Sequence, residues 1–180
     1  LKIFTEDCEM KKTSVTSVEI TSTIGEEKMG RPMGTYITLE SVFIKENNPE
    51  AHEKLIAILS KHLNQLCPLN NEKPILVVGL GNSQVTPDSL GPKTVDKILV
   101  TRHLKEILPD SISETVRSVA ALSPGVMGVT GIETLEVIKG IVERIQPQLV
   151  IAIDALAARK VSRINTTIQI CDTGVAPGGG

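Results

Sequence analysis

The stretch Pro-Ile-Leu-Val-Val-Gly-Leu-Gly-Asn-Ser-Gln-Val-Thr-Pro-Asp-Ser-Leu-Gly-Pro-Lys, residues 74 to 93, decides the fold of this chain. Its aliphatic run at 75–78 is short, continuous and closed by Gly79, which is typical of a parallel strand buried on both faces. Gly79 and Gly81 allow a sharp turn after this strand. Asp88 follows in the crossover, where open α/β sheets place their ligands and reactive groups.

Hydrophobic periodicity predicts the elements around this strand. Residues 15–20 and 35–42 alternate apolar and polar side chains, which predicts a hairpin-like pair at a sheet edge. Helices are predicted over residues 49–67, 92–107 and 130–146, and further strands over 117–122, 149–153 and 166–170. The alternation of strand and helix from residue 75 onward predicts a three-layer α/β/α fold with a mostly parallel, twisted sheet.

Length and composition predict one compact domain inside the cell. A chain of 180 residues can bury a sizeable core, so we expect a single α/β domain over 15–180, preceded by a polar, loose segment over 1–14. Three widely spaced cysteines fit reduced thiols better than a disulfide frame or a zinc site. The sequence starts at Leu1 and stops in Ala-Pro-Gly-Gly-Gly, so both ends look cut.

Charge and aromatic content argue against two classes of partner. The 19 basic and 21 acidic residues are well mixed, with a net charge of −2, which disfavours direct binding to nucleic acid or a membrane surface. The aromatic residues Phe4, Tyr36 and Phe43 offer little stacking surface for single-stranded bases. No apolar run approaches ~18 residues and no secretory leader pattern opens the chain, so we expect a cytoplasmic protein.

Two aspartates form the strongest candidate site. Asp154 follows the apolar run 149–153 much as Asp88 follows the first strand, so neighbouring parallel strands would bring both carboxylates to one sheet edge. Two adjacent carboxylates share a proton: the ionised one can deprotonate water while the protonated one polarises an amide carbonyl. The alternative is structural, with Asp88 capping the next helix and Asp154 holding the turn after its strand.

Other motifs leave further alternatives. Gly79 and Gly81 resemble the start of a dinucleotide-binding loop, but the third glycine of that motif and the acidic residue that should follow a second strand are missing. The sequence also has neither a phosphate-binding loop nor the motifs of a serine triad. Asp172-Thr-Gly resembles the active tripeptide of two-lobed aspartic proteases. Glu133 adjoins the glycine-rich loop 123–131, where it is either a first-turn helix acid or a third carboxylate.

A series of segments, taken together, carries a much more specific signal. The two most telling are Val85-Thr-Pro-Asp-Ser-Leu-Gly-Pro-Lys and Ile151-Ala-Ile-Asp-Ala-Leu. The others lie at 30–41, 78–82, 101–104, 124–134 and 165–174. In their order along the chain, these segments resemble one family, the germination proteases, or spore proteases, of endospore-forming bacteria.

The resemblance implies an atypical aspartic endopeptidase without a cofactor, which degrades small acid-soluble spore proteins in the spore core when germination begins. It also implies a zymogen that removes its N-terminal propeptide by self-cleavage, and a homotetramer. The fold would be similar to that of the hydrogenase maturation proteases, where the corresponding acidic positions bind nickel. Members of this family continue well past Gly180, so we expect the chain to be truncated at its C-terminus.

The leading hypothesis is peptide-bond hydrolysis by a water activated between Asp88 and Asp154, the two residues that match the family's catalytic aspartates. Backbone N–H groups in two loops would stabilise the carbonyl oxygen of the substrate. The loop residues are Gly79, Gly81, Asn82, Gly125, Gly128 and Gly131, with Glu133 beside them. Two alternatives stay open: metal-assisted cleavage by the same carboxylates with Glu133 or a histidine, and a non-catalytic fragment that binds without cutting.

Overall fold

The structure of the chain is a computed structural model that describes residues 1–7, 10–67, 73–108, 112–113, 115–158 and 160–175. The chain divides into two compact units. Unit 1 comprises Leu1–Pro68 and Ala158–Gly174, and unit 2 comprises Leu69–Ala157 and Val175–Gly180. The prediction of a single domain over 15–180 stays a prediction. The prediction of one mostly parallel sheet is wrong, because the described strands form an antiparallel sheet in unit 1 and a parallel sheet in unit 2.

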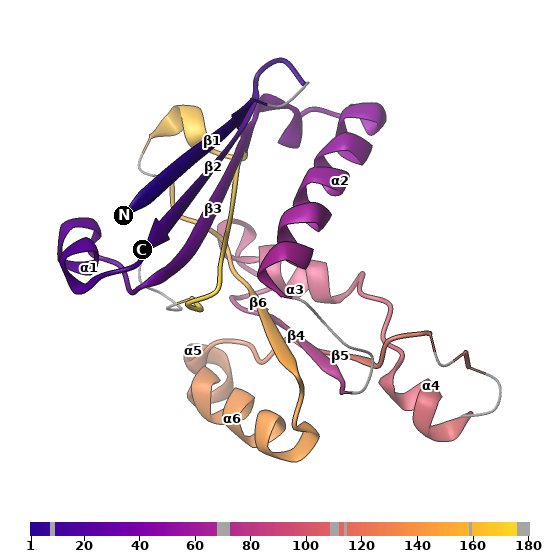
Figure 1. Cartoon of the computed structure of the whole chain (residues 1–180). Coiled ribbons are helices and arrows are strands. Elements are labelled where there is room, and N and C mark those ends of the chain that lie inside the picture. The colour runs from indigo at the N-terminus through magenta and orange to yellow at the C-terminus, as the bar shows by residue number, and fades with distance from the viewer. Residues whose placement is uncertain (8–9, 68–72, 109–111, 114, 159, 176–180) are drawn as a thin grey trace. The chain divides into compact units, whose positions relative to one another are not determined.

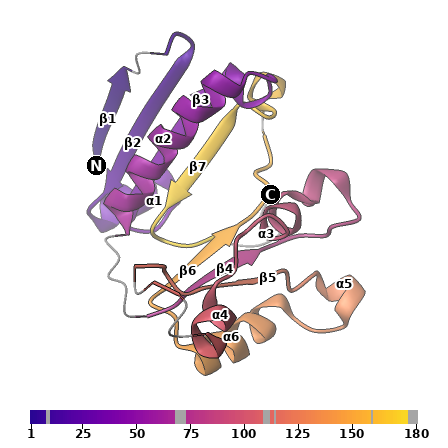
Figure 2. The same ribbon diagram turned by 90° about the vertical axis from the view of Figure 1, so that its right-hand side faces the viewer.

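Unit 1 is built on four antiparallel strands in the order β1-β2-β3-β7. The first three are labelled in Figure 1, and Figure 2 shows β7 beside them. Their bounds are Lys2–Asp7 for β1, Thr13–Ile20 for β2, Gly34–Ser41 for β3 and Thr167–Cys171 for β7. The predicted antiparallel pair is confirmed as β2 and β3, but its placement at a sheet edge is wrong, since β1 and β7 flank it.

Two of these strands differ from the sequence-based expectation. Residues 2–7, expected to be loose, pair along their whole length with β2 and add an ion pair between Lys2 and Glu19 at 3.7 Å. This strand lacks a clear apolar alternation, so its pairing partner decides its conformation. The strand predicted over 166–170 exists as β7, yet it pairs with β3 instead of joining the parallel sheet.

One long helix covers a face of the antiparallel sheet. Helix α2, Pro49–Leu66, confirms the predicted helix and starts where the Asn48 side chain accepts the Ala51 N–H at 3.1 Å. Its apolar stripe packs onto the strands, and Figure 2 shows the helix over one face of their sheet. The buried cluster consists of Val15, Ile37, Leu39 and Leu55. Two short pieces, α1 at Thr23–Met29 and the 3-10 turn η1 at Val42–Ile44, complete this part of unit 1.

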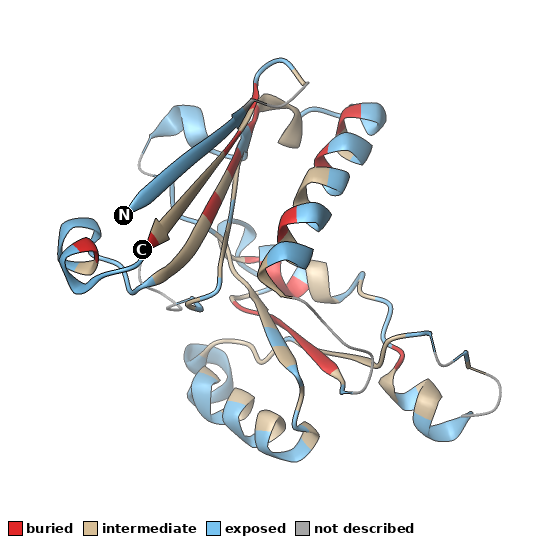
Figure 3. Ribbon diagram, viewed as in Figure 1, coloured by how far each residue is buried: buried red, intermediate tan, exposed pale blue. Residues whose placement is uncertain are grey.

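Unit 2 contains a parallel sheet of three strands in the order β5-β4-β6. The strands are β4 at Ile75–Gly79, β5 at Val119–Leu122 and β6 at Leu149–Ile153, which confirms the strands predicted in these places. All five residues of the central strand β4 are buried, as Figure 3 shows. The strand is aliphatic throughout because it has a neighbouring strand on each edge and both of its faces are buried.

Helices lie on both faces of this small sheet. Helix α6, Thr134–Ile145, packs its apolar stripe against Leu76, Val78 and Leu80. Helix α3, Leu90–Val95, contacts β4 and β6 from the face to which Gly79 belongs, so unit 2 keeps a layered arrangement around three strands (Figure 2).

The helix predicted over 92–107 is broken. It is replaced by α3 and by α4 at Arg102–Ile107. Between them, Thr101 donates its N–H to Val119 O and its hydroxyl to Arg117 O, and it accepts the Val119 N–H on that hydroxyl at 2.9 Å. These bonds tie the chain to the start of β5 and are incompatible with a continuous helix.

The remaining short elements are the 3-10 turns η2 at Thr86–Asp88 and η4 at Val161–Arg163, and helix α5 at Met127–Thr130. Over the residues that the structure describes, no helix is both long enough and apolar enough to cross a membrane.

The core of unit 2 generates a stability prediction. Leu76 is 1% exposed in β4, so Leu76→Ala should cost about 2–5 kcal/mol of unfolding free energy, because it removes buried methyl groups and leaves a cavity. Leu99→Ala, at a residue 79% exposed, should change it by less than ~0.5 kcal/mol. Urea denaturation followed by circular dichroism measures both, and equal midpoints for the two variants would contradict this account of the core.

Candidate active site

The candidate site lies at the carboxyl edge of the parallel sheet. Strands β4 and β6 pair in register from Ile75 opposite Leu149 to Gly79 opposite Ile153. One further hydrogen bond, from Leu80 N–H to Ile153 O at 2.8 Å, continues this pairing past the end of β4. Asp154 is the next residue, so it leaves the sheet at the same edge as the turn after β4.

Asp88 is attached to that turn by its side chain. Its Oδ2 accepts the backbone N–H of Asn82 at 2.8 Å, and the residue is half-buried. The alternative role, in which the Asp88 side chain caps the following helix, is wrong. The N-cap residue of α3 is Ser89, and no side-chain hydrogen bond caps this helix. The carboxylate of Asp88 is thus held across the loop that carries it, next to the end of β4.

Asp154 is also half-buried, and it holds the backbone that follows it. Its Oδ1 accepts the N–H of Ala155 at 2.8 Å, as the structural alternative for this residue expects. One oxygen of each aspartate therefore fixes a backbone segment. The other oxygens, Oδ1 of Asp88 and Oδ2 of Asp154, have no hydrogen-bond partner within the described ranges of the chain.

The glycines of the first loop have different roles. Gly81 has φ +108°, and a Cβ at this position would lie 2.1 Å from Asp88 O and 2.8 Å from Asp88 Oδ1. Gly79 packs against α3, where a Cβ would lie 2.3 Å from Gly91 O. Asn82 uses its N–H for Asp88 and accepts the Gln84 N–H on its side-chain oxygen at 2.9 Å.

The second glycine-rich loop follows β5, whose carboxyl end lies at the same edge because β5 is parallel to β4. Gly125 and Gly131 have φ +76° and +71°, and Gly128 lies within the short helix α5. The Gly131 N–H donates to Met127 O at 2.8 Å. Glu133 is exposed at the N-terminus of α6, and its N–H donates to the Glu136 carboxylate at 3.3 Å, which is a helix-capping role.

Three other candidate groups belong to unit 1 and not to unit 2. Asp172 belongs to unit 1, where its carboxylate accepts the Thr35 N–H at 2.8 Å beside Gly34. His62, 4% exposed on α2, bonds to Gln65 through Nδ1 at 3.1 Å, and His52 bonds to the Phe43 carbonyl at 3.0 Å. Within the part of the chain that the structure describes, no three His, Cys, Asp or Glu side chains gather as a metal site would require.

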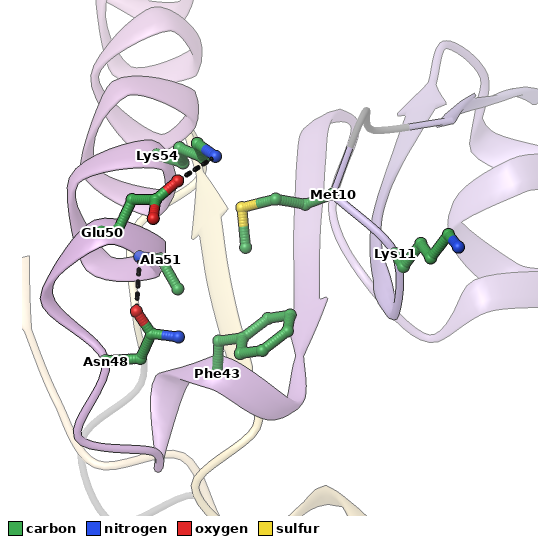
Figure 4. A pocket seen from close by; sticks show the side chains of 7 residues that line it. All are labelled: Met10, Lys11, Phe43, Asn48, Glu50, Ala51 and Lys54. Atoms are coloured by element: carbon green, nitrogen blue, oxygen red, sulfur yellow. Dashed lines mark hydrogen bonds and ion pairs between the residues drawn. The ribbon is translucent and has the colours of Figure 1, made fainter.

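Two hollows of the surface are lined by residues of unit 1. A cavity of about 180 Å³ opens between the start of α2 and the β1–β2 connection, with Met10, Phe43 and Ala51 among its lining residues (Figure 4). At its rim the Lys54 ammonium bonds to Glu50 at 2.8 Å and lowers the pKa of that carboxyl. A second, polar hollow of about 420 Å³ is lined by Arg163 and several hydroxyl groups. Neither Asp88 nor Asp154 lines these two cavities.

Sequence reasoning missed one participant at the sheet edge. The sequence predicts a helix from residue 92 and assigns no role to Gly91, which is buried against the ends of two strands. The adjacent Gly-Pro pair gave a signal for a helix start but none for a close backbone contact. Such contacts depend on residues from distant segments, which a local pattern does not reveal.

Comparison with known proteins gives a uniform result. The family model described as germination protease matches residues 2–180. The germination protease of Bacillus pumilus is 52% identical over 92% of this chain and 45% of its own length. Those of Caldanaerobacter subterraneus subsp. tengcongensis and Priestia megaterium are 49% and 46% identical, over 92% and 99% of this chain. The matches cover 51% and 49% of those two proteins, so the chain spans about half the length of these curated relatives.

The geometry of Gly81 generates a second prediction. Gly81→Ala should lose ~1–3 kcal/mol more stability than Gly131→Ala, because the added methyl group meets Asp88 in addition to straining the backbone. Gly131 also has a positive φ, but a Cβ there meets nothing within 4 Å, which makes it the matched control. Chemical denaturation of both variants tests this, and equal losses would show that the contact with Asp88 imposes no constraint.

Proposed function

The chain belongs to the germination protease family, and from this premise we propose that it forms the catalytic part of an endopeptidase that cleaves small acid-soluble spore proteins. The observation that carries the proposal is the parallel pairing of β4 with β6, which leads the Asp88 loop and Asp154 out of the sheet at one edge. Strand ends of this kind are where α/β proteins concentrate their reactive groups.

The proposed reaction uses one aspartate as base and the other as acid. The ionised carboxylate takes a proton from a water molecule, and the resulting hydroxide adds to the carbonyl carbon of the peptide bond. The protonated carboxylic acid donates its proton to the carbonyl oxygen. The tetrahedral intermediate then collapses. As the C–N bond breaks, one of its hydroxyl groups returns a proton to the second aspartate, and the leaving nitrogen receives from the first aspartate the proton that came from water. The assignment is supported by Oδ1 of Asp88 and Oδ2 of Asp154, which have no hydrogen-bond partner among the residues that the structure describes.

Backbone N–H groups would stabilise the partial negative charge that develops on the carbonyl oxygen before the aspartic acid protonates it. In the first loop, the N–H groups of Leu80 and Asn82 already donate to Ile153 and to Asp88, so Gly81 is the better donor there. In the second loop, the first turn of α5 supplies N–H groups that a helix start leaves unpaired, including that of Gly128.

Several finer features belong to the same proposal. The substrates, the zymogen with its self-cleaved propeptide, the homotetramer and the location in the spore core are proposed from the resemblance to this family. The matched relatives from Caldanaerobacter and Bacillus pumilus are about twice as long as this chain. Metal-assisted cleavage is the second candidate mechanism, in which Glu133 would join the two aspartates. The exposed position of Glu133 and its use at the start of α6 favour the metal-free mechanism.

The proposal predicts the effect of three matched substitutions. Asp88→Asn and Asp154→Asn should each lower the cleavage rate by at least ~1,000-fold, because an amide can neither take the proton of water nor supply one. Far-UV circular dichroism should stay unchanged. Asp172→Asn should retain activity, because the amide oxygen can still accept the Thr35 N–H in unit 1. Cleavage of a purified small acid-soluble spore protein, followed by mass spectrometry, measures all three.

The same assay separates the alternatives. Loss of activity in a chelator, with recovery on adding a divalent cation, would favour the metal-assisted mechanism. Binding of the spore protein without any cleavage by the wild-type chain would favour a non-catalytic fragment. Wild-type rates in Asp88→Asn or Asp154→Asn would remove the physical basis of the proposal.

A further inference from the structure

We propose that Gly91 is a positioning residue, which sets the distance between the two aspartates by letting the first turn of α3 lie directly on the ends of β4 and β6. The inference rests on the proposed function. It assigns a role to a residue that has no side chain and touches no substrate.

The contact involves the atoms that join the two strands. A Cβ at Gly91 would lie 2.3 Å from Leu80 O, 2.5 Å from Leu80 N and 2.5 Å from Ile153 O. The last two are the donor and the acceptor of the hydrogen bond that continues the pairing of β4 and β6. A side chain at Gly91 therefore cannot be added without moving α3 or breaking this bond.

Gly79, at the end of β4, lies equally close to the backbone of α3. A Cβ at Gly79 would lie 2.3 Å from Gly91 O and 2.8 Å from Val95 Cγ2. Two backbones thus meet at a pair of glycines, with no side chain between them. Gly91 is buried, and neither glycine has a positive φ, so it is the close approach rather than the backbone conformation that requires glycine.

This contact links the two segments that carry the aspartates. Asp88 lies in η2, immediately before α3, and Asp154 directly follows Ile153. Any movement of α3 away from the strand ends would carry Asp88 with it, while loss of the Leu80–Ile153 bond would release Asp154. Because a displacement of ~1 Å in reacting groups can cost about 100-fold in rate, a single methyl group here should reduce catalysis.

The test compares two helical glycines of unit 2. Gly91→Ala should lower kcat by about 10- to 100-fold with KM changed by less than ~3-fold, since the substrate-binding surface remains. Gly140→Ala, where a Cβ meets nothing within 4 Å, should leave both constants unchanged. Amide hydrogen exchange at Leu80 should accelerate in Gly91→Ala and stay unchanged in Gly140→Ala, which reports on the contact independently of activity.

Each outcome is decisive. Wild-type kcat in Gly91→Ala would overturn the proposal, and so would loss of the far-UV circular dichroism spectrum, because Gly91 would then serve folding as a whole. If the wild-type chain itself cleaves nothing, the proposed function fails, and the exchange rate of Leu80 alone decides whether Gly91 fixes this edge. Equal exchange in the two variants would then reject the positioning role.

Discussion

The hydrogen bond from Leu80 to Ile153 is the interaction on which the geometry of unit 2 depends. Among the described strands of the parallel sheet, β4 is the one with a neighbour on each edge, and its pairing with β6 ends at Gly79 and Ile153. The hydrogen bond from Leu80 to Ile153 holds the ends of β4 and β6 together at the point where both segments leave the sheet. Its net free energy is only about 1 kcal/mol, so its importance lies in position rather than in strength.

Close backbone packing accompanies this bond. Side chains can adjust their rotamers, whereas two backbones in contact leave no freedom for adjustment, and the structure uses glycine where they meet. The Asn82 N–H then anchors the Asp88 carboxylate to the turn. The carboxylates are thus oriented mainly by main-chain atoms, which vary little when side chains change.

Much of unit 2 could be predicted from sequence, because its elements carry strong local signals. The continuous aliphatic run of β4, the apolar stripe of α6 and the proline after it define these elements by themselves. The break at Thr101 was missed because its cause is a set of bonds to Arg117 and Val119, far along the chain. Asp88 and Asp154 could be selected as site residues because each follows a predicted strand of a parallel sheet. The contact at Gly91 could not be predicted, because no pattern in the neighbouring sequence indicates it.

The sheet of unit 1 was the larger failure of sequence reasoning. The strand at 167–171 has the apolar content of a strand in either sheet, and only its partner decides which one it joins. Likewise residues 2–6 of β1 are exposed and weakly patterned, and the pairing of this strand with β2 gives it its conformation.

The return of the chain to unit 1 has a consequence for biosynthesis. Thr35 and Asp172, which meet at the β3–β7 pairing, are 137 positions apart, and all of β4, β5 and β6 lies between them. On the ribosome, β3 is made long before its neighbour emerges, so its outer edge waits unpaired while the parallel sheet is completed. Exposed edges of this kind invite pairing with other nascent chains, and chaperone capture during translation would protect the half-built sheet.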